Sequence, residues 1–144
     1  MSTGAFSVRL THWGADAAAL QLVRRRVFID EQRVPENLEW DEIDGACIHA
    51  LACAPDGAPI GCGRLLPDGH VGRMAVLASW RGRGVGDALL TTLVDTARRR
   101  GDARVMLNSQ AQAMPFYARH GFRPCGPPFE EAGIPHQAMQ LDLR

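Results

Sequence analysis

The chain has 144 residues, which is the length of one domain and is enough to bury a hydrophobic core. Hydrophobic residues make up 46% of it, so the composition excludes an intrinsically disordered chain. Sixteen basic and sixteen acidic side chains give a formal net charge of zero, which argues against nucleic-acid binding through net positive charge.

The segment 1–5 has no basic stretch, and no apolar run follows it, so we expect no secretory signal. No apolar run approaches the length of a membrane-spanning helix, and we therefore expect a cytoplasmic protein without a membrane partner. The cysteines show no C-x-x-C spacing, which favours reduced thiols over a metal site. They are Cys47, Cys53, Cys62 and Cys125.

Residues 6–10 alternate apolar and polar side chains, which predicts a first strand. Asp16 is the expected N-cap of a helix that runs to about Gln32. The buried stripe of this helix is expected to consist of Leu20, Val23 and Val27. We interpret the arginines at 24–26 as a solvated face with at most one buried stem.

Residues 33–45 are irregular and acidic, and Pro35 and Gly45 bracket them as a loop with a short helical piece inside. Two interpretations of its carboxylates are equally open. They could line a site for a cationic amine, or they could be solvated while Trp40 packs into the core. The carboxylates are those of Glu36, Glu39, Asp41, Glu42 and Asp44.

Three apolar runs of strand length come next, at residues 47–54, 60–66 and 70–77. Each of the two connections contains Pro-Asp-Gly, a sequence typical of tight turns. We therefore predict an antiparallel meander of three strands.

The last of these strands leads into a glycine-rich loop, residues 81–86, and then into an amphipathic helix. Apolar residues at three- and four-residue steps form its buried face: Leu89, Leu90, Leu93, Val94 and Ala97. Arginines fill the last turn and Gly101 ends the helix. Because glycines leave the backbone open and the first-turn N–H groups favour an anion, the loop predicts a phosphate-binding site.

This loop differs from the two common nucleotide-binding loops. A P-loop requires a lysine, and the chain contains none. The dinucleotide fingerprint requires a third glycine, where this chain has Asp87 or Leu89.

Residues 104–108 read as a fifth strand, which the helical crossover makes parallel to the strand before the loop. Ligands bind at the carboxyl ends of such strands, where the glycine loop lies. A short helix at 111–120 and strands at 122–125 and 137–143 complete the pattern. Proline and glycine predict a loop at 126–135.

Two motifs resemble those of the GNAT superfamily of N-acetyltransferases. Arg81, Gly84 and Gly86 fit its pyrophosphate loop, (R/Q)-x-x-G-x-(G/A), and residues 113–122 fit A-x-x-F-Y-x-x-x-G-F. The resemblance covers the whole chain and implies a single N-acetyltransferase domain, 1–144, of the α/β class. The expected GNAT fold is one mixed, mostly antiparallel sheet of six to seven strands, flanked by helices around a central strand–glycine loop–helix–strand unit.

The resemblance implies acetyl-CoA as cosubstrate, without a metal. The backbone of residues 74–76 would pair with the pantetheine arm, which separates the fourth and fifth strands. The amides of residues 81–86 would hold the pyrophosphate with Arg81 or Arg83, and Asn108 either bonds the arm or merely ends its strand. The implied cofactor-binding residues are Met74, Ala75, Val76, Arg81, Gly82, Arg83, Gly84, Val85, Gly86, Asn108 and Phe116.

The implied reaction is direct acetyl transfer to a primary amine of a small-molecule acceptor. Tyr117 is the only tyrosine and stands where the family's general acid does, although a packing role is the alternative. Glu39 and Asp41 are candidates for the base or for amine binding. The full set of candidate bases is Glu39, Asp41, Asp44, His49 and His136.

We expect no nucleic-acid partner and either a monomer or a homodimer. An alternative function is a CoA-binding or CoA-sensing module that keeps this fold without turnover.

Overall fold

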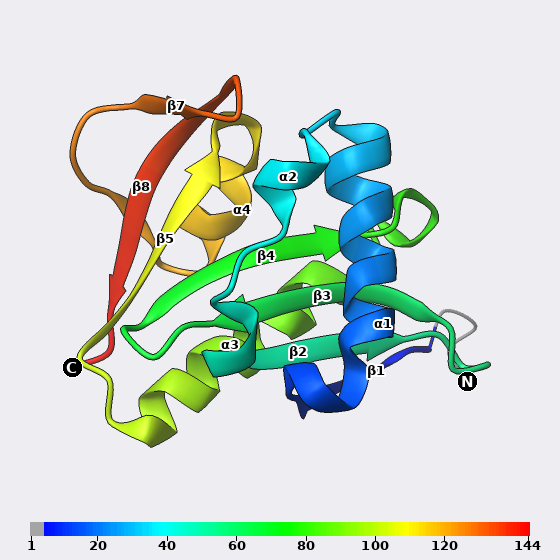
Figure 1. Ribbon diagram of the computed structural model, residues 1–144. Coiled ribbons are helices and arrows are strands. Elements are labelled where there is room, and N and C mark those ends of the chain that lie inside the picture. Colours follow the sequence, from blue (N-terminus) through cyan, green and yellow to red (C-terminus); the bar gives the residue numbers. More distant parts are fainter. Residues whose placement is uncertain (1–4) are drawn as a thin grey trace.

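A computed structural model of the chain describes residues 5–144, and the expectation about an N-terminal signal falls mainly outside this range. The described part folds as one mixed sheet with helices on both faces (Figure 1). Its strands are β1 (Ser7–Thr11), β2 (Ile48–Cys53), β3 (Pro59–Leu65), β4 (His70–Val76), β5 (Arg104–Gln110), β6 (Arg123–Pro124), β7 (Phe129–Glu131) and β8 (Ile134–Asp142). Its helices are α1 (Trp13–Arg24), α2 (Glu36–Glu39), α3 (Val85–Arg100) and α4 (Met114–Arg119).

A π-helical segment and three short 3₁₀ turns complete the list. They are η1 (Arg25–Glu31), η2 (Asp44–Ala46), η3 (Ala78–Trp80) and η4 (Ala111–Ala113).

The strand order is β1-β2-β3-β4-β5-β8-β6, and β7 pairs with the first three residues of β8, residues 134–136. Strands β1 to β4 are antiparallel neighbours, which confirms the predicted meander. β5 is parallel to β4 and antiparallel to β8. The α/β class and the mixed, mostly antiparallel sheet are therefore confirmed, but the sheet has eight strands where six to seven were expected, because β7 forms in a segment that was expected to be a loop.

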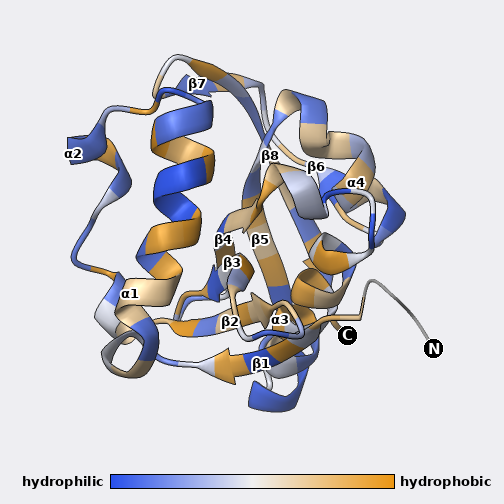
Figure 2. Ribbon diagram, turned by 90° about the vertical axis from the view of Figure 1, so that its right-hand side faces the viewer, coloured by the Kyte–Doolittle hydropathy of each residue, from blue (hydrophilic) through white to orange (hydrophobic). Residues whose placement is uncertain are grey.

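The sheet separates two apolar layers, with α1 on one side and α3 and α4 on the other (Figure 2). Alternate residues of one strand serve the two layers, as the two-residue period of a strand requires. On β2, Leu51 packs with Leu20 and Val23 of α1, whereas Ala50 and Ala52 pack on the α3 side.

The helix after the glycine loop has the buried face that its spacing predicts. Leu89, Leu90 and Leu93 have no exposed surface, and burying each contributes roughly 1.5–3 kcal/mol. Gly101 ends the helix in the left-handed conformation, with φ of 92°. The loop that precedes α3 is thus attached to a rigid element.

The predicted first helix differs from the observed one at its start and in its last two turns. Helix α1 begins at Trp13, and Asp16 lies inside it with non-helical angles. The Asp16 carboxylate accepts hydrogen bonds from Arg9 and Thr11 and does not cap the helix. The last turns, η1, are a π-helix, a form that often marks functional sites.

The sequence predicted a loop at 126–135, but part of it forms a hairpin. Strand β7 pairs with a β8 that begins at Ile134, three residues earlier than expected. The two turn residues, Ala132 and Gly133, have φ of 52° and 76°. Both angles belong to a tight hairpin turn that usually carries Asn-Gly or Asp-Gly, so Ala-Gly gave little signal.

Candidate functional site

Strands β4 and β5 separate after a short contact. Their parallel pairing covers only His70 with Met106 and Val71 with Leu107. Beyond these pairs β4 follows β3 while β5 turns away, and the two strands diverge in Figure 1. A β-bulge lies on β4 where the strands diverge. It is marked by the positive φ of Arg73, 49°, and by a shift in the β3–β4 register.

A cavity of about 1050 Å³ lies along this divergence. On one face of the sheet it is bordered by Val85 of α3 and by Phe116 and Tyr117 of α4. On the other face it is bordered by Phe28 of η1 and Leu38 of α2. The cavity therefore passes through the sheet between β4 and β5.

All of the residues implied for the cofactor line this cavity except Arg83. Gly82 and Gly84 have φ of 77° and 86°, conformations that glycine adopts without strain. Gly84 is the N-cap of α3 and leaves the first-turn amides without a side-chain cap. Gly86 has ordinary angles, but a Cβ there would lie 3.4 Å from the Phe116 ring.

The two loop arginines are held by other groups. The Arg81 guanidinium donates to both carboxylate oxygens of Glu31 at 2.6 and 2.7 Å, and its Nε donates to the Val76 carbonyl. These hydrogen bonds lower the pKa of Glu31 and join η1 to the loop. The Arg83 guanidinium lies over the Trp80 ring at 4.7 Å, outside the cavity lining.

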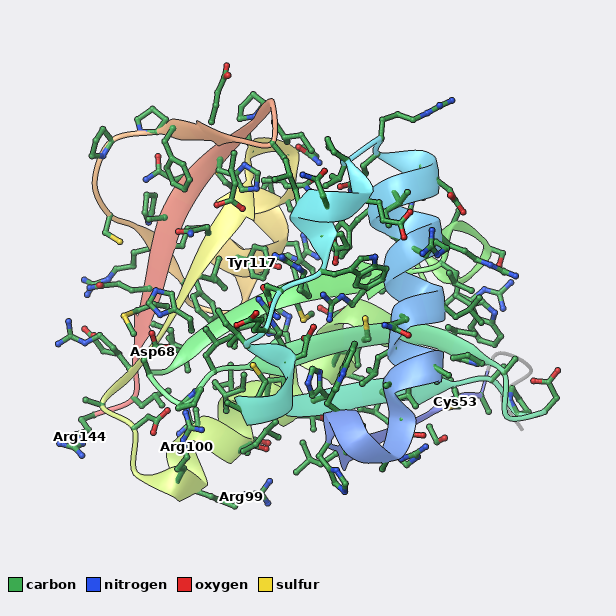
Figure 3. The ribbon with its side chains drawn as sticks, viewed as in Figure 1. Cys53, Asp68, Arg99, Arg100, Tyr117 and Arg144 are labelled. Carbon is green, nitrogen blue, oxygen red and sulfur yellow. The ribbon has the colours of Figure 1, made fainter. Side chains whose placement is uncertain are left out.

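Tyr117 lies on α4, where β4 and β5 separate (Figure 3). Pro115 is tolerated beside it because it occupies the first turn of the helix. Tyr117 packs edge-to-face against Phe116 and Phe122, at ring distances of 5.0 and 5.9 Å. Burial raises the pKa of Tyr117 to about 12, so its hydroxyl remains protonated at neutral pH.

The acidic loop has both solvated and buried carboxylates: Glu36 and Glu42 are exposed, whereas two others are enclosed. Glu39 and Asp44 are each only 3% exposed, and Trp40 is half-buried beside the Arg24 guanidinium at 5.1 Å. The ion pairs are Arg24–Glu39 (2.9 Å), Arg24–Asp44 (2.8 Å), Arg64–Asp41 (2.9 Å), Arg64–Asp44 (2.9 Å), Arg73–Glu39 (3.1 Å) and Arg73–Asp41 (3.4 Å). We call these six residues the buried ion cluster.

The interpretation of the three consecutive arginines allowed one buried side chain, and this cluster shows that it is Arg24 and that its guanidinium is buried as well. Arg24 is not part of a solvated face, because it is 1% exposed and its guanidinium is fully engaged. Its neighbours, Arg25 and Arg26, are exposed as expected. Sequence spacing could not reveal this difference, since the carboxylates that hold Arg24 lie 15 and 20 residues away.

The candidate bases differ in whether they line the cavity. Asp41, Asp44 and His49 do not line the cavity, whereas Glu39 and His136 do. Burial raises the pKa of Glu39 against the opposing charges of Arg73 and Arg24.

Sequence reasoning missed a chain of neutral amides on the η1 face of the cavity. The Gln110 side chain donates to the Gln32 side chain at 2.8 Å and accepts from Gln112. All three line the cavity and link η1 to the end of β5. No motif marks such residues, but a β5 extended by two residues would have brought Gln110 to this edge.

Comparisons with known proteins agree with this geometry. A family model for the acetyltransferase (GNAT) domain matches residues 15–143. The uncharacterized N-acetyltransferase YjcF of Bacillus subtilis is 40% identical over 125 residues, which is 83% of this chain and 88% of that protein.

Solved structures extend the agreement to three dimensions. An acyl-CoA N-acyltransferase from Pseudomonas aeruginosa has a TM-score of 0.83 at 30% identity, covering 94% of this chain and 99% of the other. Escherichia coli ElaA has the same TM-score at 29% identity, with the same coverage. Within residues 5–144, no helix is long and apolar enough to cross a membrane.

Proposed function

The chain belongs to the GNAT family of N-acyltransferases, and from this premise we propose that it moves the acetyl group of acetyl-CoA directly to a primary amine. The acceptor in this proposal is a small molecule. Family membership supports an acyl-CoA cosubstrate, while the choice of acetyl-CoA and of the acceptor is our own.

The observation that carries the proposal is the cavity through the sheet. At one end it meets the left-handed glycines and open amides before α3, where a pyrophosphate would be held. Along β4 it exposes the backbone of residues 74–76, which lie beyond the last β4–β5 pair. A pantetheine arm could pair there as a strand would, which would bring its thioester toward Tyr117.

The proposed reaction needs a proton donor for the leaving group. The thioester supplies an electrophilic carbon, and its sulfur leaves as a thiolate that needs a proton. Tyr117 is the donor that lines the cavity, and its raised pKa keeps the proton in place until the sulfur departs. The phenol ring is held by aromatic contacts on two sides, so its hydroxyl is positioned before the substrate arrives.

The acceptor side differs from the cationic-amine site that the acidic loop first indicated. Three guanidiniums balance the three carboxylates of the buried ion cluster, so little field remains to attract a cation. Beside the charged groups of Glu31 and Glu131, the cavity wall there includes apolar side chains and neutral amides: Val27, Phe28, Val34, Leu38, Ile134, Gln32 and Gln110. We therefore propose an acceptor with one amine on an apolar body, in place of a polyamine.

The test is a thiol-release screen with acetyl-CoA and matched amines. Apolar monoamines such as phenylethylamine are compared with polyamines and with free amino acids, and longer acyl-CoAs are compared with acetyl-CoA. We expect thiol release that requires both substrates and is fastest with apolar monoamines. CoA binding without transfer to any amine would favour the sensing module, and a preference for polyamines would contradict the acceptor assignment.

A further inference from the structure

His136 occupies a distinctive place on β8. It pairs with Gln110 of β5 on one side and with Phe129 of β7 on the other. Paired residues of neighbouring strands point to the same face of a sheet, and Gln110 donates a hydrogen bond to Gln32, the residue that follows η1. His136 thus faces the η1 side of the cavity, whereas Tyr117 reaches it from α4 on the opposite side.

The hydrogen bonding of the His136 ring determines which nitrogen can accept a proton. Its Nδ1 lies 2.7 Å from the Ile134 carbonyl oxygen, and a carbonyl can only accept, so Nδ1 carries hydrogen. Nε2 has no hydrogen-bond partner among residues 5–144, and it is not one of the buried atoms that lack a partner. The neutral ring therefore presents a bare, accessible Nε2 to the cavity.

Glu39, the other candidate base on the cavity wall, is poorly suited to accept a proton. Its Oε2 accepts from Arg24 at 2.9 Å and lies 3.1 Å from the Arg73 Nε. Protonating it would remove a carboxylate charge that two largely buried guanidiniums share and leave them only Asp44 and Asp41, which is costly. Protonating His136 would not break an ion pair of this kind, because its ring contacts are a carbonyl and the stacked Phe129 ring at 5.8 Å.

We propose that His136 is the general base that deprotonates the acceptor amine, an inference that rests on the proposed function. The ammonium gives one proton to Nε2, and the free amine nitrogen forms a bond to the thioester carbon. The carbon–sulfur bond then breaks, and the thiolate takes the proton of Tyr117. The nitrogen's second proton restores Tyr117, and His136 releases its proton to water.

Other charged groups border the same cavity and contribute to its pH response. They are Glu31 of η1, Glu39 of α2, Arg64 of β3, His70 and Arg73 of β4, Arg81 and Asp87 at the glycine loop, Tyr117 and Arg119 of α4, and Glu131 of β7. The test must therefore separate His136 from these groups by substitution, because a wild-type pH profile alone would not identify the base.

The informative variant is His136→Asn, because the asparagine amide can still donate to the Ile134 carbonyl but cannot accept a proton as Nε2 does. We expect kcat/KM for the best amine of the screen to fall about 10²- to 10⁴-fold, with unchanged acetyl-CoA affinity. The acidic limb of the wild-type profile of kcat/KM against pH should move up to the pKa of the amine itself, because the variant can react only with the free amine. Added imidazole should restore part of the activity.

His70→Asn is the matched control, since His70 also borders the cavity but its Nδ1 lies 3.0 Å from the Asp68 carboxylate. It should keep the wild-type acidic limb. An acidic limb that stays at its wild-type position in His136→Asn, or one that moves in His70→Asn, would overturn the assignment. A wild-type protein that transfers nothing would instead overturn the proposed function.

A measurement without substrate tests the same nitrogen. In protein labelled with ¹⁵N-histidine, long-range proton–nitrogen spectra report which ring nitrogen carries hydrogen. We expect the neutral His136 ring to have hydrogen on Nδ1 and none on Nε2. The opposite tautomer would remove the accessible acceptor and overturn the proposal.

Discussion

At the scale of single residues, Tyr117 shows how packing and chemistry coincide in one side chain. The same aromatic contacts that make it a core residue also fix the direction of its hydroxyl. Burial disfavours the charged phenolate and so raises the pKa of Tyr117 to about 12. A residue of the hydrophobic core can therefore be a proton donor without titrating at neutral pH.

Replacing Tyr117 with phenylalanine separates these two roles. The ring and its contacts remain, so we expect acetyl-CoA affinity and stability to change little. Losing a positioned donor should lower kcat by about 10²- to 10⁴-fold, measured by thiol release at saturating substrates. An unchanged kcat, when chemistry limits turnover, would assign Tyr117 to packing alone.

The direction of the pKa shift adds a second expectation for this residue. An ordinary tyrosine ionises near pH 10, and a raised pKa means that the folded protein keeps the proton to higher pH. Tyr117 should therefore cause no alkaline loss of activity below about pH 10. If activity fell with rising pH below about pH 10, and this fall were absent in Tyr117→Phe, the hydroxyl would be more acidic than its burial implies.

At the scale of elements, the glycine loop and α3 form a unit whose conformation the sequence encodes locally. Gly84 has φ of 86°, and a Cβ there would meet nothing within 4 Å. Replacement by valine would thus strain the backbone without a collision inside the protein. The added branched side chain would stand where the pyrophosphate is expected.

We therefore expect Gly84→Val to weaken acetyl-CoA binding at least tenfold, or about 1.4 kcal/mol, by calorimetry. Gly57→Val is the matched control, because Gly57 has φ of 90°, also has nothing within 4 Å, and lies in a hairpin turn away from the cavity. Both variants should lose similar stability, and only Gly84→Val should lose affinity. Equal affinity in the two would contradict the loop assignment.

The buried ion cluster joins α1, α2, β3 and β4, and it predicts stability more than acceptor binding. Glu39→Gln should lower the free energy of unfolding by roughly 3–5 kcal/mol, because it removes one of the three carboxylate charges that offset three largely buried guanidiniums. Glu36→Gln, which removes a 56% exposed partner of Arg25, should have a much smaller effect in the same denaturant titration. If the two variants were equally stable, the cluster would not hold these elements together.

How far the sequence predicts an element depends on whether its signals are local. Helix α3 and its loop carry periodic leucines, a glycine stop and φ-permissive glycines, so they were predicted closely. Strand β7 depends on pairing with β8 and on an Ala132–Gly133 turn that has no strong signal. The π-helical η1 has no composition of its own and was read as an ordinary helix.

The candidate site shows the same division. The residues expected to hold the cofactor are nearly consecutive, and all of them except Arg83 line the cavity. The wall that we propose for the acceptor was not predicted, since it assembles from η1, α2, β5 and β8 through contacts such as Gln32–Gln110, 78 residues apart. The acidic loop misled for a related reason, because the arginines that neutralise it come from other elements.

At the scale of the whole molecule, the divergence of β4 and β5 leaves a cavity that connects the two faces of the sheet. The glycine loop and Tyr117 lie toward α3 and α4, while His136 and the amide chain lie toward η1. Cosubstrate and acceptor can therefore enter from opposite sides and meet within the sheet. Such an arrangement permits direct transfer, because neither substrate has to leave before the other binds.

The same divergence predicts how the molecule responds to CoA. Residues 72–76 of β4 lie beyond the last β4–β5 pair, so a bound pantetheine arm should take the place of the missing strand. At a concentration 100 times its Kd, CoA should raise the free energy of unfolding by about 2.7 kcal/mol. Amide exchange should slow along residues 72–76 as well as in the glycine loop.

ATP is the discriminating control, since it carries phosphates and adenine but no pantetheine. It should give less stabilisation than CoA and should leave the exchange of residues 72–76 unchanged, even where it slows exchange in the glycine loop. Equal stabilisation by both ligands, or CoA binding that leaves β4 exchanging freely, would mean that the arm does not lie between the strands. In that case the divergence of β4 and β5 would need an explanation other than the cosubstrate.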